Sequence, residues 1–195
     1  MPVASATGPQ IWRMTVDRYD RLAELGWFGD QRVELIEGRI VRMAAQLEPQ
    51  VASVSLGAKA AARAFGAGYY VRFQAPLVQG KFSKPEPDLA VVRGSERDYL
   101  NSGTPTTALL VIEISDTTLR QDRGRKASIY ARWGIADYWI LNLVDRQLEV
   151  HRDPVRDRKY KMGFGYASIQ VVKPGDSIAP LAAPQALIAV ADLLP

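Results

Sequence analysis

The stretch A-L-L-V-I-E-I-S, residues 108–115, decides the fold. It is apolar on both faces apart from Glu113, which is typical of a central strand covered on both sides. A helical pattern over 122–133 follows and stops at Gly134, and another strand-like run over 138–143 comes next. This order predicts a helix lying on a sheet between two of its strands. The chain is therefore expected to be an α/β protein with a mixed β-sheet flanked by helices.

The residues before this core predict an N-terminal helix plus a β-hairpin. Apolar residues recur at helical spacing over 15–25, with a threonine able to cap the first turn. The run V-E-L-I-E-G-R-I-V-R-M, residues 33–43, surrounds an E-G pair at 37–38, which indicates a two-residue hairpin turn. That turn places Glu34 opposite Val41.

The remaining elements follow from the same patterns. We expect a helix over 49–65, strands over 69–78, 88–92, 148–151, 160–162 and 168–172, and a short helix near 185–193. We expect one domain over residues 1–195, with an N-terminal tail at 1–13 and a packed, mostly irregular C-terminal segment at 174–195.

Composition excludes several kinds of chemistry. The chain has no cysteine, which excludes a disulfide scaffold, a thiolate nucleophile and sulfur-bound metals. Its one histidine, His151, would have to serve a catalytic triad or a metal cluster alone. No apolar run of about 18 residues is present, so no membrane helix is expected. Since the N-terminus also lacks the pattern of a signal peptide, we expect a cytoplasmic protein.

The basic residues are concentrated in one segment. The formal charge is +4, and residues 120–161 carry 11 basic and 6 acidic residues. Such a segment suits a polyanion such as nucleic acid, although a solvated surface of that charge is about equally common.

Three acids stand where a carboxylate is costly. Asp88 opens a strand after a proline-bounded loop, Glu113 lies inside the apolar strand, and Glu34 faces inward on the hairpin. A structural acid explains any one of them, but three in one small domain point to a site. Carboxylates are the ligands that Mg²⁺ or Mn²⁺ prefers.

A cation is still needed beside these acids. Ser115 shares a strand face with Glu113, where a lysine would be expected. Lys126 could replace it, because Asp122, Lys126 and Tyr130 are spaced by four and share one face of the next helix. The spacing alone favours a solvent-exposed Asp122–Lys126 pair.

Several motifs together resemble the Uma-type restriction endonuclease family of the PD-(D/E)XK phosphodiesterase superfamily. They are the hairpin run at 33–43, P-E-P-D-L-A-V-V at 85–92, the long segment at 110–143 and L-E-V-H-R-D-P at 148–154. The resemblance implies a restriction-endonuclease-like core and DNA cleavage with a divalent metal, Mg²⁺ or Mn²⁺. By position, Asp88 and Glu113 resemble the metal-binding acids, Glu34 the hairpin acid, and Lys126 the family lysine moved from strand to helix.

One position departs from the family. Gln50 stands where the family usually has a histidine opening the second helix, and glutamine does not titrate near neutral pH. Gln50, Ser115, Asp122 and Tyr130 are possible supporting residues, with Asp122 orienting Lys126.

The leading hypothesis is a metal-dependent DNA endonuclease that hydrolyses phosphodiester bonds. Its expected catalytic residues are Glu34, Asp88, Glu113 and Lys126. Asp88 and Glu113 are expected to hold the metal, with Glu34 as a further ligand, direct or through water. The alternative is a catalytically weak DNA-binding or protein-interaction module on a nuclease scaffold. A homodimer is also expected, because cutting both strands of a duplex suits two sites related by a two-fold axis, and because Trp27 and Phe28 look exposed.

Overall fold

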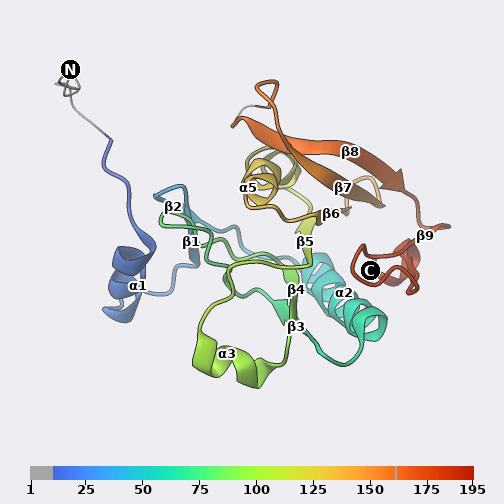
Figure 1. Ribbon diagram of the computed structural model, residues 1–195, viewed down its shortest axis with the longest axis horizontal. Coiled ribbons are helices and arrows are strands. Elements are labelled where there is room, and N and C mark those ends of the chain that lie inside the picture. Colours follow the sequence, from blue (N-terminus) through green and yellow to red (C-terminus); the bar gives the residue numbers. More distant parts are fainter. Residues whose placement is uncertain (1–10, 161) are drawn as a thin grey trace, which may run out of the picture.

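A six-stranded mixed sheet forms the centre of the computed structural model, which describes residues 11–160 and 162–195 (Figure 1). Its strands lie in the order β3-β4-β5-β6-β7-β8. Their bounds are β3 Tyr69–Phe73, β4 Leu89–Arg93, β5 Leu110–Ser115, β6 Asp137–Asn142, β7 Gln147–Arg156 and β8 Phe164–Val172. All six residues of β5 are buried, as expected for a central strand. The expected mixed α/β fold is confirmed.

The only parallel pairing of this sheet joins β5 to β6, and a helical crossover connects these two strands. The crossover contains α4 (Leu119–Gln121), a π-helical turn η1 (Asp122–Lys126) and α5 (Ala127–Arg132). The sequence predicts one helix over 122–133. In the structure the helical segment begins earlier, at Leu119, and its turn over Asp122–Lys126 is a wider π-helical turn. Such π-helical turns are rare and often occur at functional sites.

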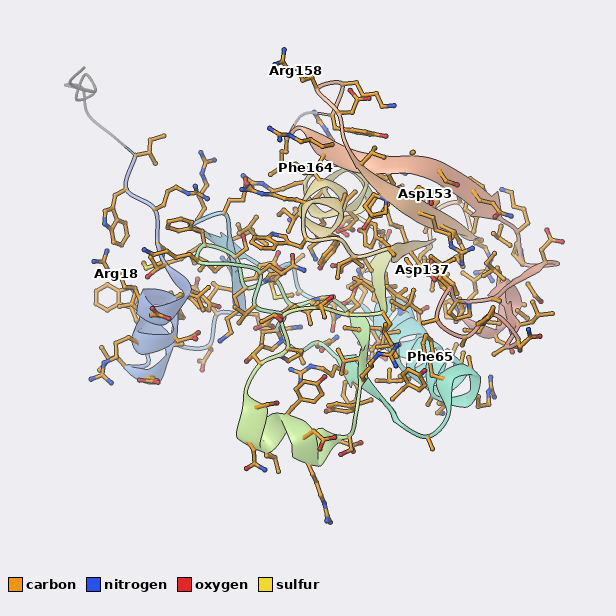
Figure 2. The ribbon with its side chains drawn as sticks, viewed as in Figure 1. Arg18, Phe65, Asp137, Asp153, Arg158 and Phe164 are labelled. Carbon is orange, nitrogen blue, oxygen red and sulfur yellow. The ribbon has the colours of Figure 1, made fainter. Side chains whose placement is uncertain are left out.

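Helices cover both faces of the sheet. On one face α2 (Glu48–Phe65) and the C-terminal segment pack against apolar side chains such as Ile112 and Trp139. Figure 2 shows Phe65 within this layer, at the end of α2. On the other face α5 packs against residues such as Val111 and Ile140. The sheet is thus buried on both sides near β5.

The hairpin forms with the predicted register. It contains β1 (Val33–Ile36) and β2 (Arg39–Arg42), and Glu34 lies opposite Val41. The turn residues Glu37 and Gly38 have φ angles of 51° and 80°, the left-handed backbone that a two-residue hairpin turn requires. Leu35 is fully buried against α1 (Val16–Glu24), which confirms the expected N-terminal helix plus hairpin.

Three expectations in the middle of the chain differ from the structure. The strand expected over 69–78 ends at Phe73, because Gln74 adopts a φ of 48° and a proline follows at 76. The polar stretch after β4 contains an unpredicted helix, α3 (Glu96–Ser102), at whose start the backbone N–H and the hydroxyl of Ser95 both donate to Asp98 Oδ2. The strand expected over 160–162 is wrong at residues 160 and 162, since β8 begins after the turn at Gly163.

The C-terminal segment is mostly irregular, and the prediction of a helix near 185–193 is wrong. Instead β9 (Ser177–Ile178) pairs with β10 (Ile188–Ala189), and a single 3-10 turn η2 (Val190–Asp192) follows. Ile188 and Val190 are both buried, an alternation that suits a strand better than a helix. Residues 1–10 of the expected tail lie outside the described residues. Among those described, no helix is both long and apolar enough to cross a membrane.

Candidate active site

A pocket of about 150 Å³ opens where the hairpin, the start of α2, the beginning of β4 and the crossover meet. All four residues expected to be catalytic line it, namely Glu34, Asp88, Glu113 and Lys126. They come from four separate parts of the chain, so the fold alone brings them together. Gln50 and Asp122 line the same pocket.

Glu113 is a deeply buried acid of the pocket lining and is held by two donors. Its side chain projects from the middle of β5, and the residue is 2% exposed. Lys126 Nζ donates to Oε1 over 2.9 Å, and Tyr130 Oη donates to the same oxygen over 2.7 Å. Oε2 has no hydrogen-bond donor among the described residues. Both protein contacts therefore fix one oxygen and leave the other for a ligand.

Burial sets the ionisation of this pair. Burial and the neighbouring acid Asp88 raise the pKa of Glu113, although Lys126 lowers it in part. Burial alone would lower the pKa of Lys126, but the carboxylates of Glu113, Glu34 and Asp122 outweigh it and raise that pKa. The lysine therefore stays protonated at neutral pH.

Asp88 lies at the entrance of β4. Its Oδ2 accepts a hydrogen bond from the Ile114 backbone N–H at 2.8 Å, which ties it to the strand carrying Glu113. Its Oδ1 accepts from Gln46 Nε2 at 3.3 Å. Burial raises the pKa of Asp88, and the Ile114 N–H lowers it only in part. The two acids thus share a site in which negative charge is costly and a cation would be favourable.

Glu34 approaches from the hairpin. It is 2% exposed, and its Oε2 accepts the Glu86 backbone N–H at 3.2 Å. The hairpin register explains this position, because the face that buries Ile36 also carries Glu34 toward the sheet.

Asp122 and Lys126 are buried rather than exposed, so the prediction of a surface ion pair is wrong. Their exposed fractions are 2% and 8%. Asp122 Oδ2 accepts bonds from Ser115 Oγ and Thr118 Oγ1, each at 2.6 Å, while Oδ1 lies 3.9 Å from Lys126 Nζ. Asp122 is therefore anchored to the end of β5 and adds negative charge beside the lysine.

Gln50 is expected from the sequence as a possible supporting residue, whereas two further glutamines, Gln46 and Gln74, are not. Gln50 Oε1 accepts the Leu47 backbone N–H at 3.1 Å, which caps the start of α2 at the pocket rim. Gln46 was not predicted; it donates to Asp88 and accepts from Gln74 Nε2 at 2.7 Å. No sequence pattern marks Gln46, since it lies in a loop that only the fold brings to Asp88.

The acidic side chains of the pocket fit a magnesium or manganese ion that is held by two carboxylates. Mg²⁺ is commonly held by one or two carboxylates, with water and phosphate oxygens as the other ligands. Asp88 and Glu113 supply such a pair. In the described part of the chain no three acidic or histidine side chains are grouped to hold one ion. Direct coordination of the ion by Glu34 together with both other acids is therefore not favoured. Contact between Glu34 and the ion through a water molecule is favoured instead.

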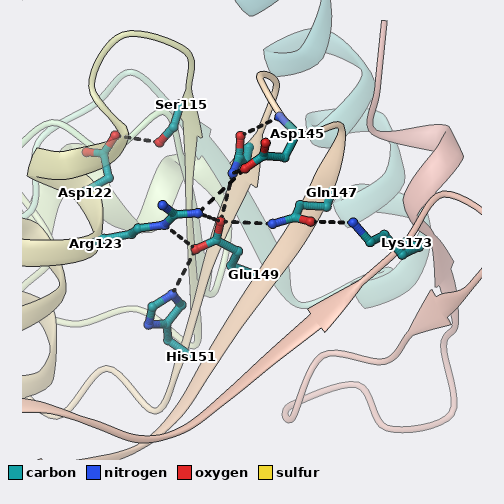
Figure 3. Close-up of polar contacts among 9 residues, drawn as sticks. Ser115, Asp122, Arg123, Asp145, Gln147, Glu149, His151 and Lys173 are labelled. Carbon is teal, nitrogen blue, oxygen red and sulfur yellow. Dashed lines mark hydrogen bonds and ion pairs between the residues drawn. The ribbon is translucent and has the colours of Figure 1, made fainter.

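Part of the expected basic surface is already neutralised. Arg123 donates to both oxygens of Glu149, and Figure 3 shows this pair among polar side chains that include Gln147 and His151 of β7. His151 is 3% exposed, and it is not among the residues that line the pocket. Of the aromatics expected to be exposed, Trp27 is 73% exposed, whereas Phe28 packs half-buried on Tyr19.

The mixed sheet, with a carboxylate on its central strand and helices on both faces, defines the class of protein: a restriction-endonuclease-like α/β fold. Residues 16–191 match the Uma2 family, described as "Putative restriction endonuclease". The chain belongs to this family.

A solved structure shares the fold. It is described as a "putative nuclease belonging to DUF820" from Anabaena variabilis, and it matches with a TM-score of 0.67 at 15% sequence identity. The match covers 92% of this chain and 97% of that one. No curated protein matches this chain.

Proposed function

We propose that this chain is a DNA endonuclease that hydrolyses phosphodiester bonds with Mg²⁺ or Mn²⁺. The observation that carries the proposal is the arrangement at Glu113, where Lys126 and Tyr130 occupy one carboxylate oxygen and leave the other without a donor among the described residues, in a pocket that Asp88 also lines. Membership of a family of restriction-endonuclease type supports the same chemistry.

In this proposal Asp88 and Glu113 hold the ion, and Glu34 contacts it through water. When bound, the divalent cation neutralises charge on the phosphodiester and makes a nearby water more acidic. Lys126, kept protonated by its acid neighbours, orients the attacking water or stabilises the charge that develops on the phosphate. Tyr130 fixes the carboxylate of Glu113, and Asp122, held by Ser115, keeps the lysine in place.

Two arginines support an anionic substrate. Arg32 and Arg42 line the pocket, and guanidinium groups are well suited to bind phosphate oxygens. Since cutting both strands of a duplex suits two sites related by a two-fold axis, we also propose that the working form is a homodimer.

The experiment is cleavage of supercoiled and linear DNA with Mg²⁺, with Mn²⁺ and in EDTA. We expect metal-dependent nicking that is lost in Asp88→Ala and in Lys126→Ala. Glu96→Ala is the matched control, because Glu96 lies exposed at the start of α3 and away from the pocket. Full activity of Asp88→Ala, or cleavage that persists in EDTA, would contradict the proposal.

The second candidate is a DNA-binding or protein-interaction module on the nuclease scaffold. Gln50 favours it, because its side chain caps a helix and has no group that titrates near neutral pH. A module of this kind binds DNA equally well with Mg²⁺ and in EDTA and cuts no substrate.

A further inference from the structure

One edge of the sheet lacks the protection that edge strands normally carry. The edge strand β8 reads F-G-Y-A-S-I-Q-V-V and contains no charged residue and no proline. Natural sheets usually interrupt such edges with charges, prolines or short strands, because an open edge pairs with other chains. β3, at the opposite edge, is only five residues long and carries Arg72.

Only the first part of β8 is covered. Ser128 Oγ donates to the Phe164 carbonyl, and Tyr160 Oη donates to the Tyr166 carbonyl. The ring of Tyr160 also lies against Gly165. From Ala167 to Val171 every residue is exposed, and no described residue outside β7 hydrogen-bonds to this part of the strand.

The backbone direction of the open part follows from the pairing with β7. The Tyr166 carbonyl accepts from Tyr160 and not from the facing Pro154, which has no N–H to donate, so the Pro154–Tyr166 pair has no ladder bonds. The regular alternation is interrupted at Asp153, whose φ is 58° and which has no ladder partner in β8. If the Arg152–Ser168 pair also lacked ladder bonds, Asp153 would pair with Ala167, so Ser168 and Gln170 bond to β7 and the backbone groups of Ile169 and Val171 point outward. The open edge therefore presents unpaired donors and acceptors.

The side chains of the same stretch form an apolar stripe. Ala167, Ile169 and Val171 share one face of the strand, and the polar Ser168 and Gln170 share the other. Ile169 is 57% exposed and Val171 is 49% exposed. Cross-strand apolar pairs are a main source of sheet stability, so this stripe suits a partner strand of the same kind.

We propose that β8 pairs antiparallel with β8 of a second copy of this chain, with the two-fold axis at Ile169. This register places Ile169 opposite its own copy and Ala167 opposite Val171, so a small side chain meets a larger one. A neutral strand meets itself without repulsion, and the two-fold pairing closes the assembly. Pairing of β8 with β3 would instead be head-to-tail and leave open edges. The inference rests on the proposed homodimer and not on the proposed chemistry.

Cross-linking tests the register. The natural chain has no cysteine, so Ile169→Cys introduces a single thiol. Opposed residues that exchange ladder bonds have Cα atoms about 5.5 Å apart, within the range of a disulfide. We expect mild oxidation to convert Ile169→Cys largely into a covalent dimer that dithiothreitol reverses. The control is Val144→Cys, 63% exposed in the turn after β6, which should stay monomeric on the same gel. Equal cross-linking of both variants, or none of Ile169→Cys, would overturn the register.

Light scattering tests the interface itself. We expect the wild-type chain to have twice its 21.6 kDa mass, and Ile169→Lys to be monomeric with an unchanged circular dichroism spectrum. A wild-type monomer at high concentration, or an Ile169→Lys dimer, would refute the proposal. DNA cleavage is measured on the same samples. A wild-type dimer that cuts no DNA supports the interface and refutes the proposed chemistry, whereas a monomeric wild type that cuts DNA does the reverse.

Discussion

Replacing Lys126 by methionine removes a charge from the interior while nearly conserving side-chain volume. Lys126 Nζ lies 2.9 Å from Glu113 Oε1, and the two side chains are 10% and 3% exposed. At this distance and an effective dielectric of about 20, the attraction is about 6 kcal/mol, which desolvation largely offsets. Breaking such a pair leaves a buried charge unpaired and costs about 3–5 kcal/mol. We expect the free energy of unfolding to fall by that amount.

The assay is urea unfolding followed by circular dichroism, with two companion variants. Lys84→Met is the control: Lys84 Nζ lies 2.6 Å from Asp20 Oδ1, but the Asp20 side chain is 38% exposed. This variant should lose only about 1 kcal/mol, because partly exposed pairs contribute little. Adding Glu113→Gln to Lys126→Met should restore more than half of the loss, since no uncompensated charge remains. Equal losses in the two lysine variants, or additive effects in the double variant, would refute the burial of this pair.

Three further predictions concern separate parts of the molecule. Burial alone would raise the pKa of Glu149, but hydrogen bonds, led by those from Arg123, outweigh it and lower that pKa. The folded pKa then lies below the unfolded one, so this stabilisation is lost as the pH falls below about 4. The free energy of unfolding, measured as a function of pH, should therefore change less below about pH 4 in Glu149→Gln than in the wild type. Gly80→Ala should lower stability by about 1–3 kcal/mol in thermal unfolding, because Gly80 has a φ of 65° and its added Cβ would meet the Trp133 ring. Gln50→His should raise the DNA cleavage rate and make it depend on pH between about 6 and 7; a flat profile would show that this position moves no proton.

The parts of the fold that local patterns determine could be predicted from the sequence. The E-G pair at 37–38 allows the backbone that a two-residue turn needs, and this turn sets the register that carries Glu34 inward. The unbroken apolar run of β5 likewise predicts a strand covered on both faces. Both features depend on neighbours in the chain.

The parts that depend on distant contacts could not be predicted. A four-residue spacing does not distinguish a surface pair from a buried one, and only the crossover places Asp122 and Lys126 against β5. The π-helical turn there leaves no clear mark in D-R-G-R-K. The contact between Gln46 and Asp88 joins residues 42 positions apart. By contrast, the shared helix face did indicate that Tyr130 lies with Lys126, and both donate to Glu113.

The most direct measurement of the proposed chemistry is the nicking rate of supercoiled DNA by the wild-type chain and by Glu113→Gln, each with Mg²⁺ and with EDTA. Glutamine keeps the size of the side chain and the contact with Tyr130 but removes the charge that would hold the ion. We expect the wild type to nick DNA only with Mg²⁺, and Glu113→Gln to be at least about 100-fold slower, the loss typical of removing one essential stabilising group. Equal rates for the two proteins, or wild-type nicking in EDTA, would contradict a metal-dependent nuclease site at Glu113.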